Sequence, residues 1–399
     1  MPRVLCIINR LNLGGPAFHV AILTKYLSPE YEMKLVAGTK QDSEESSDYI
    51  VREMGLNFTS LPEMHRSLHP VRDYKSYKEL RKIIREYKPD IVHTHAAKAG
   101  ALGRLAALKE GVPVIIHTFH GHVFHSYFSP LKTKIFLAIE RYLGKRSSAI
   151  IAISERQKKD LAFKYAVAKP TKIRMIPLGF DLSRFQEGTE EKRIRFRDKY
   201  FVSDDEIAVG IIGRVVPIKN HSMFINSAKA VLEKTGKKVR FFIIGDGESR
   251  DHLLHEAAVL GLDYTYFPST AKKAVFTFCS WIKDVDYAVA GLDIVAMTSY
   301  NEGTPVSLIE AQAGNRAVIS TNVGGIENVI SKNETALLVD SNNYDQFTAA
   351  LLKLIEDDEL RNQMGSKGWE FVKEKFHFTR MIREVSELYR SLLKKRYGR

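Results

Sequence analysis

The chain is poor in cysteine and has no long apolar run. Its 399 residues include two cysteines, Cys6 and Cys279, and both lie in apolar, strand-like runs. We expect buried thiols in a reducing compartment and no disulfide framework. No stretch of ~18 consecutive apolar residues occurs, so we expect no membrane span. The N-terminal apolar run is short and ends before Asn9 and Arg10, which indicates a strand and not a signal peptide.

Two common ligand signatures are also missing. Gly14 and Gly15 follow the first strand-like run, but they do not form a G-x-G-x-x-G motif, and no acidic residue closes the next run at 35–37. These features argue against a dinucleotide site. His93 and His95 share one face of a strand, yet no His, Cys or carboxylate set has convincing metal-ligand spacing. We therefore expect neither a metal nor a dinucleotide cofactor.

The order of apolar runs predicts an α/β protein with two doubly wound parallel sheets. A chain of this length favours two domains, and 44% hydrophobic with 27% charged residues is typical of a globular protein. Strand-like runs alternate with helical stretches, as parallel sheets require. The expected strands are 3–8, 33–37, 91–94, 114–118, 149–153, 207–212, 239–244, 275–278, 294–297, 317–320 and 337–339. The expected helices are 16–27, 71–87, 98–110, 130–146, 221–234, 249–260, 305–314, 344–355 and 379–395.

A polar stretch at 186–200 separates the two series of strands. We expect a Rossmann-like domain at 1–182, a second at 183–376, and a C-terminal helix, 377–399, that crosses back onto the first. Such sheets bind ligands at the carboxyl ends of their strands. If those ends face each other, the site lies in a cleft between the domains.

Positive charge is concentrated in the first half. Residues 1–180 carry 29 Lys and Arg against 16 Asp and Glu, whereas residues 181–399 carry 31 of each. A basic half suggests an anionic partner: a nucleic acid, an anionic lipid surface or a phosphorylated substrate. A merely solvated basic surface is the alternative, because net charge alone identifies no partner.

Residues 298–327 are the most informative stretch. They place Glu302 and Glu310 on either side of Pro305. If Pro305 occupies the first helical turn, Glu310 lies on the helix and Glu302 in the loop before it. The unpaired first-turn amides, including those of Val306 and Ser307, then form an anion site. Carboxylates on both sides of such a site suit a nucleotide sugar.

Cations and histidines mark two further strand ends. Arg214 and Lys219 follow the first strand of the second domain, where they can hold a diphosphate and stabilise its developing charge without a metal. In the first domain, His117, His120 and His122 follow another strand, and His120 is placed to bond a sugar hydroxyl or to position the reacting groups.

Taken in order, these motifs resemble the large family four of retaining glycosyltransferases with the GT-B fold. The resemblance covers nearly the whole chain. It rests on Gly14-Gly15, His93-Thr-His95 with Lys98-Ala-Gly100, Thr118-Phe-His120-Gly121, Pro177-Leu-Gly-Phe-Asp181, Gly213-Arg214 with Lys219, Glu302 to Glu310, and Val323-Gly-Gly-Ile-Glu327.

The resemblance implies a role for each matching position. Catalytic roles fall to His120, Arg214, Lys219 and Glu302; the nucleotide sugar is expected on Gly15, Arg214, Lys219, Trp281, Glu302, Val306, Ser307 and Glu310. Glu302 would contact sugar hydroxyls and Glu310 the ribose. The implied reaction is front-face attack with retention, in which a phosphate oxygen of the leaving group takes the acceptor proton and no metal is needed. A UDP-sugar is expected over a GDP-sugar on family frequency alone.

Three departures from the family pattern weaken any inference about the sugar. Arg316 and Ala317 are atypical after Gly314, and the Pro177 motif lacks the frequent Asn after Pro. Residues 264–274 are interpreted as an extra loop before the base-binding strand.

The acceptor is sought in the basic half. His122, Phe124, Tyr127 and Phe128 precede a basic helix that carries Lys132 and Lys134. Its apolar positions, 131, 135, 138, 139 and 142, suit either an anionic bilayer surface or a domain core. We expect a cytoplasmic enzyme, peripheral at the inner face of the plasma membrane and monomeric or weakly dimeric, that acts on a lipid-linked saccharide of bacterial surface polysaccharide.

Three alternatives stay open. A nucleotide-sugar 2-epimerase shares the two-domain architecture and would turn over donor without an acceptor. A basic nucleic-acid-binding protein is suggested by a pI of about 9.4, although the chain has no recognisable nucleic-acid module, and we expect no nucleic acid. A non-catalytic partner subunit would be expected to have lost its charged site residues.

Overall fold

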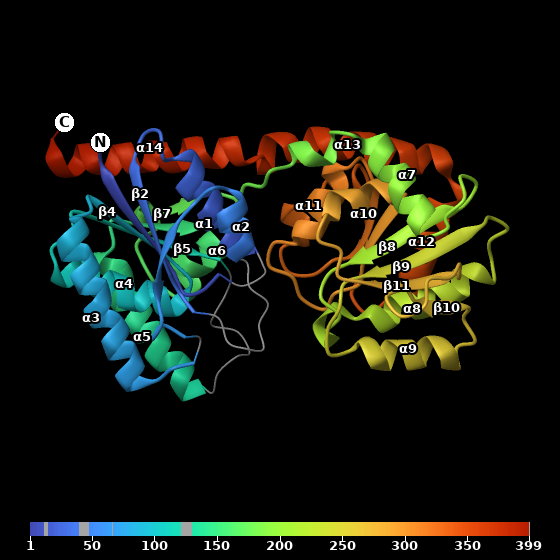
Figure 1. Cartoon of the computed structure of the whole chain (residues 1–399), viewed down its shortest axis with the longest axis horizontal. Helices are drawn as coiled ribbons and strands as arrows, with labels where there is room; N and C mark the ends of the chain where they lie inside the picture. The colour runs from blue at the N-terminus through green and yellow to red at the C-terminus, as the bar shows by residue number, and fades with distance from the viewer. Residues whose placement is uncertain (12–14, 40–47, 66, 121–129, 399) are drawn as a thin grey trace. The chain divides into compact units, whose positions relative to one another are not determined.

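The computed structural model describes residues 1–11, 15–39, 48–65, 67–120 and 130–398 (Figure 1). The chain forms two compact units. Unit 1 comprises Met1–Phe180 together with Phe378–Arg399, and unit 2 comprises Asp181–His377. Each unit contains a seven-stranded sheet in which every recorded strand pair is parallel. The predicted α/β class with two doubly wound sheets is confirmed.

The sheet of unit 1 has the strand order β3-β2-β1-β4-β5-β6-β7. Its interior strand β1 is buried from Val4 to Ile8, as a strand covered by helices on both faces must be. The strands are β1 (Arg3–Ile8), β2 (Glu32–Gly38), β3 (Phe58–Leu61), β4 (Ile91–His95), β5 (Val114–Phe119), β6 (Ala149–Ala152) and β7 (Ile173–Met175). The α-helices of its first 180 residues are α1 (Gly15–Tyr26), α2 (Asp48–Glu53), α3 (Pro70–Tyr87), α4 (Ala97–Lys109), α5 (Pro130–Arg146) and α6 (Glu155–Lys159).

The C-terminal helix α14 (Phe378–Tyr397) belongs to unit 1. Its buried residues Met381, Val385 and Tyr389 pack in one core cluster with Val4 and Ile91 of the sheet. Helix α14 is strongly amphipathic, and its packing against the sheet buries its apolar face. The expected crossing of the last helix onto the N-terminal domain is thereby observed.

The sheet of unit 2 has the order β10-β11-β9-β8-β12-β13-β14. Its strands are β8 (Ile207–Ile212), β9 (Val239–Ile244), β10 (Tyr264–Tyr266), β11 (Phe276–Ser280), β12 (Ile294–Met297), β13 (Ala317–Thr321) and β14 (Ala336–Val339). Its helices are α7 (Thr189–Lys199), α8 (His221–Leu232), α9 (Arg250–Val259), α10 (Val285–Gly291), α11 (Val306–Ala313), α12 (Tyr344–Glu356) and α13 (Asp358–Phe376).

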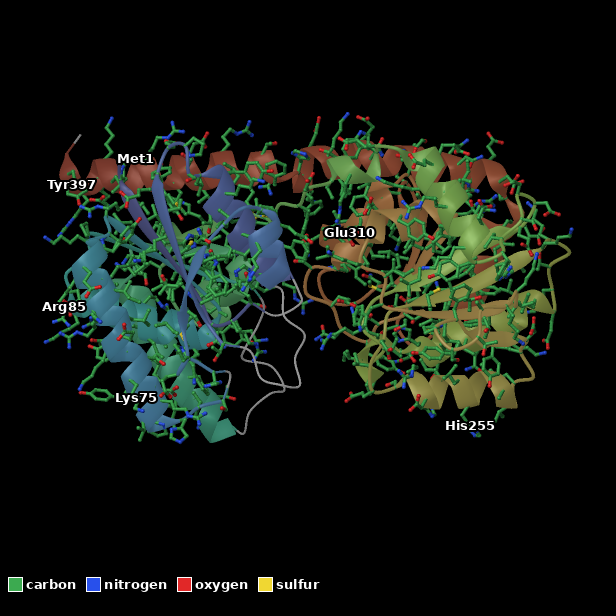
Figure 2. All side chains as sticks on the ribbon, viewed as in Figure 1. Met1, Lys75, Arg85, His255, Glu310 and Tyr397 are labelled. Atoms are coloured by element: carbon green, nitrogen blue, oxygen red, sulfur yellow. The ribbon has the colours of Figure 1, made fainter. Side chains whose placement is uncertain are left out.

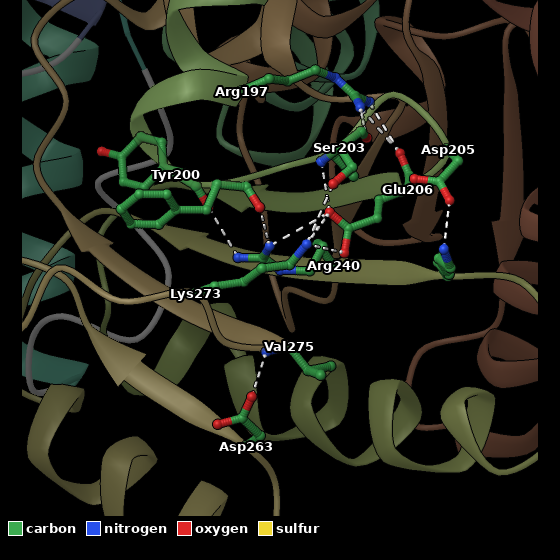
Figure 3. Close-up of polar contacts among 12 residues, drawn as sticks. Arg197, Tyr200, Ser203, Asp205, Glu206, Arg240, Asp263, Lys273 and Val275 are labelled. Carbon is green, nitrogen blue, oxygen red and sulfur yellow. Dashed lines mark hydrogen bonds and ion pairs between the residues drawn. The ribbon is translucent and has the colours of Figure 1, made fainter.

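Two segments of unit 2 differ from the sequence prediction. The polar stretch at 186–200 contains α7, and the interpretation of 264–274 as a loop is wrong for its first three residues, which form edge strand β10 against β11. A buried charge network lies in this region (Figure 3). Arg240 donates to the carbonyl oxygens of Tyr200 and Phe201 at 3.0 and 2.7 Å, beside Glu206.

Further charged pairs of this network involve α7 and the 264–274 segment. Arg197 donates to Asp293 Oδ2 at 2.7 Å. Lys273 lies 3.0 Å from Glu206, which also faces Arg240 (Figure 3). Charged residues that would usually indicate a solvated linker instead anchor α7 and the 264–274 segment to the sheet.

Among the described residues, no helix is long and apolar enough to cross a bilayer.

Candidate active site

The candidate donor residues of unit 2 follow the carboxyl ends of neighbouring parallel strands. Arg214 comes two residues after β8, Trp281 directly after β11, and Glu302 five residues after β12. Because parallel strands all end at the same edge, the topology brings the loops that carry these residues to one edge of the sheet. Arg214 is exposed, and Trp281 is 45% exposed.

Lys219 and Glu302 form an ion pair at this edge. Lys219 Nζ lies 2.5 Å from Glu302 Oε1, and Ser299 Oγ donates to the same oxygen at 2.6 Å. The 3₁₀ turn Pro217–Lys219 is held against the end of β12, where Thr298 Oγ1 donates to the Lys219 carbonyl at 3.0 Å. A cation and a carboxylate 83 residues apart in sequence therefore lie in direct contact.

Two glycines fix the loop that carries Glu302. Gly325 N donates to the Glu302 carbonyl at 2.9 Å. A Cβ on Gly324 would lie 2.0 Å from that carbonyl oxygen, and one on Gly325 would lie 1.8 Å from the oxygen of Gly303. Only glycine allows the two backbones to approach so closely, which gives the 323–325 motif a physical reason.

The helix after this loop starts one residue later than predicted. Pro305 is the N-cap of α11, with extended backbone angles of φ −74° and ψ 94°, and it is not part of the first turn. Val306 and Ser307 occupy that turn, so their amides have no partner within the helix. Positive charge from the helix dipole adds to these N–H groups, which is the arrangement that binds phosphate.

Glu310 is mostly buried on α11, near the charged side chains of Arg184 and Asp286. Burial raises the pKa of its carboxyl group to about 7, although Arg184 Nη2 lies 3.5 Å away and acts in the opposite direction. Asp286 reinforces the rise, and it is itself paired with Lys192 at 2.9 Å. Sequence reasoning missed Arg184 and Asp286, because 126 residues separate Arg184 from Glu310 and no local pattern links them.

In unit 1, His120 belongs to a buried cluster of histidines. His95 at the end of β4 and His120 just after β5 face each other, with 3.0 Å between Nδ1 and Nε2. Burial lowers the pKa of His120 to about 4, so its ring is neutral near pH 7. A neutral ring can exchange hydrogen bonds with a sugar hydroxyl, but it supplies no positive charge.

The other candidate residues of unit 1 lie on α1, on α5 or outside the described residues. Gly15 is the first residue of α1, and Lys134 is exposed on α5. The described part of Lys132 is its helical backbone. The acceptor-side candidates His122, Phe124, Tyr127 and Phe128 lie outside the described residues.

Helix α5 has two apolar faces, and one of them is exposed. Leu143 and Glu140 are buried, and Glu140 accepts two hydrogen bonds from Arg104 of α4, at 2.8 and 2.7 Å. This pair fixes which face turns inward. The opposite stripe is exposed, with Ile135 at 54%, Ile139 at 38% and Tyr142 at 47%. The core-packed explanation of these three positions is therefore wrong.

Two Rossmann-like units, with charged and glycine-containing loops at the strand ends of the second, are the architecture of the GT-B glycosyltransferases. The model for Glycosyltransferase Family 4 matches residues 13–184, and the model for Glycosyl transferases group 1 matches residues 192–371. The chain belongs to this family, as its motifs predicted.

Two bacterial glycosyltransferases and one solved structure are similar to this chain over most of its length. The chain is 28% identical over 367 residues to the Escherichia coli UDP-Gal:alpha-D-GlcNAc-diphosphoundecaprenol alpha-1,3-galactosyltransferase, covering 90% of this chain and 89% of that protein. It is 26% identical over 340 residues to the Staphylococcus aureus capsular polysaccharide biosynthesis glycosyltransferase CapM, covering 84% and 86%. The crystal structure of Anabaena Alr3699/HepE in complex with UDP has the same fold, with a TM-score of 0.79 at 17% identity over 98% of this chain and 100% of that one.

Proposed function

We propose that the protein transfers a hexose or N-acetylhexosamine from a UDP-sugar to a lipid-linked saccharide, with retention and without a metal, during assembly of a bacterial surface polysaccharide. The observation that carries the proposal is the Lys219–Glu302 pair, 2.5 Å apart beside the start of α11. The names of the Escherichia coli and Staphylococcus aureus relatives support the substrate class.

The donor would be held by charge at its diphosphate and by hydrogen bonds at its two sugars. Lys219 and Arg214 would bind the diphosphate, together with the amides of Val306 and Ser307. As the glycosidic bond breaks, negative charge accumulates on that diphosphate, and the fixed cations stabilise it. Phosphate would draw Lys219 from Glu302, which would leave the carboxylate to accept hydrogen bonds from the transferred sugar.

Glu310 would accept hydrogen bonds from the ribose, and Trp281 would lie by the base. His120 of unit 1 would face the transferred sugar as a neutral hydrogen-bonding group. No carboxylate is then required as a general base, because a phosphate oxygen of the leaving group can take the acceptor proton.

Charge and the exposed stripe of α5 support an acceptor at a membrane surface. Unit 1 carries 36 Lys and Arg against 18 Asp and Glu, and unit 2 carries 24 against 29. Inclusion of α14 in unit 1 thus makes the asymmetry larger than the halves of the sequence indicated. Ile135, Ile139 and Tyr142 lie on the same helix as Lys134 and Arg146, the pattern of a helix that lies on anionic lipid.

A ligand-binding panel tests the donor half of this proposal. Thermal unfolding of the purified protein would be followed with UDP, GDP, UDP-glucose, UDP-galactose, UDP-N-acetylglucosamine and GDP-mannose. We expect UDP and at least one UDP-sugar to raise the melting temperature, since a ligand that binds only the folded state stabilises it. A response to GDP compounds alone would contradict the choice of base.

The nucleotide-sugar 2-epimerase stays as a second candidate because it shares the architecture. It would convert or hydrolyse the donor in the absence of any acceptor, whereas a transferase would consume the donor only slowly until the acceptor is added. Incubation of the donor with and without acceptor separates the two.

A further inference from the structure

Three imidazole rings from three elements of unit 1 meet in its interior. His19 lies on α1, His95 ends β4 and His120 follows β5. The ring centre of His19 lies 4.9 Å from that of His120 and 5.4 Å from that of His95. One ring nitrogen of each residue lies within 4.8 Å of the corresponding nitrogens of the other two. The spacing of these three histidines in the sequence does not predict that they lie close together.

The cluster has unused hydrogen-bonding capacity. His19 is 3% exposed, yet neither of its ring nitrogens has a hydrogen-bond partner among the described residues. Nδ1 of His120 also has none within that part of the chain. Buried polar atoms in native proteins are almost always paired with protein, water or an ion. The two unpaired nitrogens of His19, next to the facing nitrogens of His95 and His120, therefore point to a missing ligand.

A second set of possible ligands nearby, Cys6, His93 and His95, is less suitable. Both nitrogens of His93 are engaged at 2.7 Å, Nδ1 with the Tyr389 hydroxyl and Nε2 with that of Thr118.

Cys6 instead contacts the second ring nitrogen of His95. Its Sγ lies 3.7 Å from Nε2 of His95, which leaves Nδ1 of that ring facing His120. Ligating histidines commonly have their second nitrogen engaged in this way, because the contact fixes the tautomer and the ring orientation.

We propose that His19, His95 and His120 bind one divalent transition-metal ion of the zinc class. Neutral imidazole nitrogens suit Zn²⁺, with bonds of about 2.0–2.1 Å, whereas Mg²⁺ and Ca²⁺ require oxygen ligands that this set does not supply. A modest inward shift of the three rings closes the site and leaves a fourth position open.

The ion acts as an inhibitor and not as a cofactor. It takes Nε2 of His120, the residue assigned to the transferred sugar, so bound metal removes a hydrogen-bonding group from the reaction. This second step rests on the proposed function. The binding step does not, because it depends only on residues of unit 1.

The binding step is tested by titrating the metal-free, full-length protein with Zn²⁺ against a chromogenic chelator. We expect one tight equivalent per chain. Replacement of a ligand, His19→Gln, is expected to weaken binding by roughly 100-fold or more, since changes outside the ligand set alone often cost 10–100-fold. His255→Gln is the matched control, because His255 is exposed on α9 of unit 2 (Figure 2).

Two further measurements keep the test independent of folding defects. Co²⁺ is expected to give the intense visible absorption of a tetrahedral site in the wild-type protein and in His19→Cys, which keeps a ligand, but not in His19→Gln. Circular dichroism reports whether each variant is folded. A wild-type affinity no tighter than that of exposed histidines, or an unchanged affinity in a folded His19→Gln protein, would overturn the proposal.

Inhibition is measured separately. Micromolar Zn²⁺ is expected to reduce sugar transfer in the wild-type enzyme, with recovery on addition of EDTA, and to affect His19→Gln much less. Tight binding without inhibition would overturn the inhibitory role alone. If the metal-free enzyme shows no transfer with any donor, the proposed function fails, and the binding titration still decides the metal site.

Discussion

Lys219 and Glu302 pair at 2.5 Å in unit 2, although each is assigned a different part of the donor. The pairing holds both side chains in place at modest exposure, since an unpaired charge there would be costly. Under the proposed function, the donor diphosphate would take the place of the Glu302 carboxylate beside Lys219, so donor binding would open the pair.

Lys219→Ala is expected to lower turnover by about 100-fold or more, which is the effect of removing a fixed group that stabilises developing charge. Glu310→Ala is expected to have a similar effect through the ribose. Initial rates at saturating acceptor measure both. Lys229→Ala, which removes an exposed partner of Glu233 on α8, is the control and is expected to leave the rate unchanged. Near-normal activity in both site variants would contradict the site assignment.

Donor affinity is expected to depend on pH through Glu310. Its carboxyl pKa is about 7 in the free protein, and a ribose that donates hydrogen bonds favours the ionised form. Affinity for a UDP-sugar is therefore expected to increase roughly tenfold from pH 6 to pH 8. Calorimetric titration measures it, and Glu310→Gln is expected to bind with little pH dependence. An identical pH profile in both proteins would exclude Glu310 as the cause.

The same shift affects stability with a definite sign. The folded protein holds the Glu310 proton more tightly than the unfolded chain, so the free energy of unfolding contributed by this group falls as pH rises from 4.5 to about 7. Urea unfolding of wild type and Glu310→Gln across this range isolates the contribution. A flat difference between the two proteins would show that the carboxyl is ordinary.

Transfer is expected to proceed without a divalent metal. In the proposed site, Arg214, Lys219 and the first turn of α11 would supply the positive charge for the diphosphate. Dialysis against EDTA, followed by assay in metal-free buffer with and without added Mg²⁺, measures this. A large loss that Mg²⁺ restores would show that the cations of unit 2 are insufficient.

The exposed stripe of α5 is expected to bind anionic membranes. In a sedimentation assay, vesicles of mixed phosphatidylglycerol and phosphatidylcholine are expected to bind the wild-type protein. Vesicles of pure phosphatidylcholine are not expected to bind it. Ile135→Ser with Ile139→Ser is expected to weaken retention severalfold, because apolar side chains enter the headgroup region. Val259→Ser, at an exposed position of α9, is the control. Equal binding to both vesicle types would count against the surface.

The sequence predicted the elements whose apolar runs are long and continuous. Strands β1, β8, β9 and β12 and helix α5 have the expected bounds. The short edge strands β3, β7 and β10 were missed, since three or four residues give too little periodicity. Helix α7 was missed because its charged residues pair inside the fold and do not indicate solvent.

The site was predictable where its residues form a local motif. The loop from Glu302 to Glu310 illustrates this, and the structure adds the reason for Gly324 and Gly325. Contacts between distant residues were not predictable: Arg184 beside Glu310, and His19 beside His95 and His120. A single sequence does not show which loops a sheet brings together. These contacts could therefore be identified only from the structure.

The central claim is tested most directly by the product. The protein would be incubated with an α-linked UDP-hexose or UDP-N-acetylhexosamine and a polyprenyl-diphosphate-linked N-acetylglucosamine, and the new linkage would be assigned by nuclear magnetic resonance. We predict a disaccharide-lipid with an α-linkage. A β-linked product would contradict retention, and conversion of the donor with no sugar on the lipid would contradict the proposed transferase.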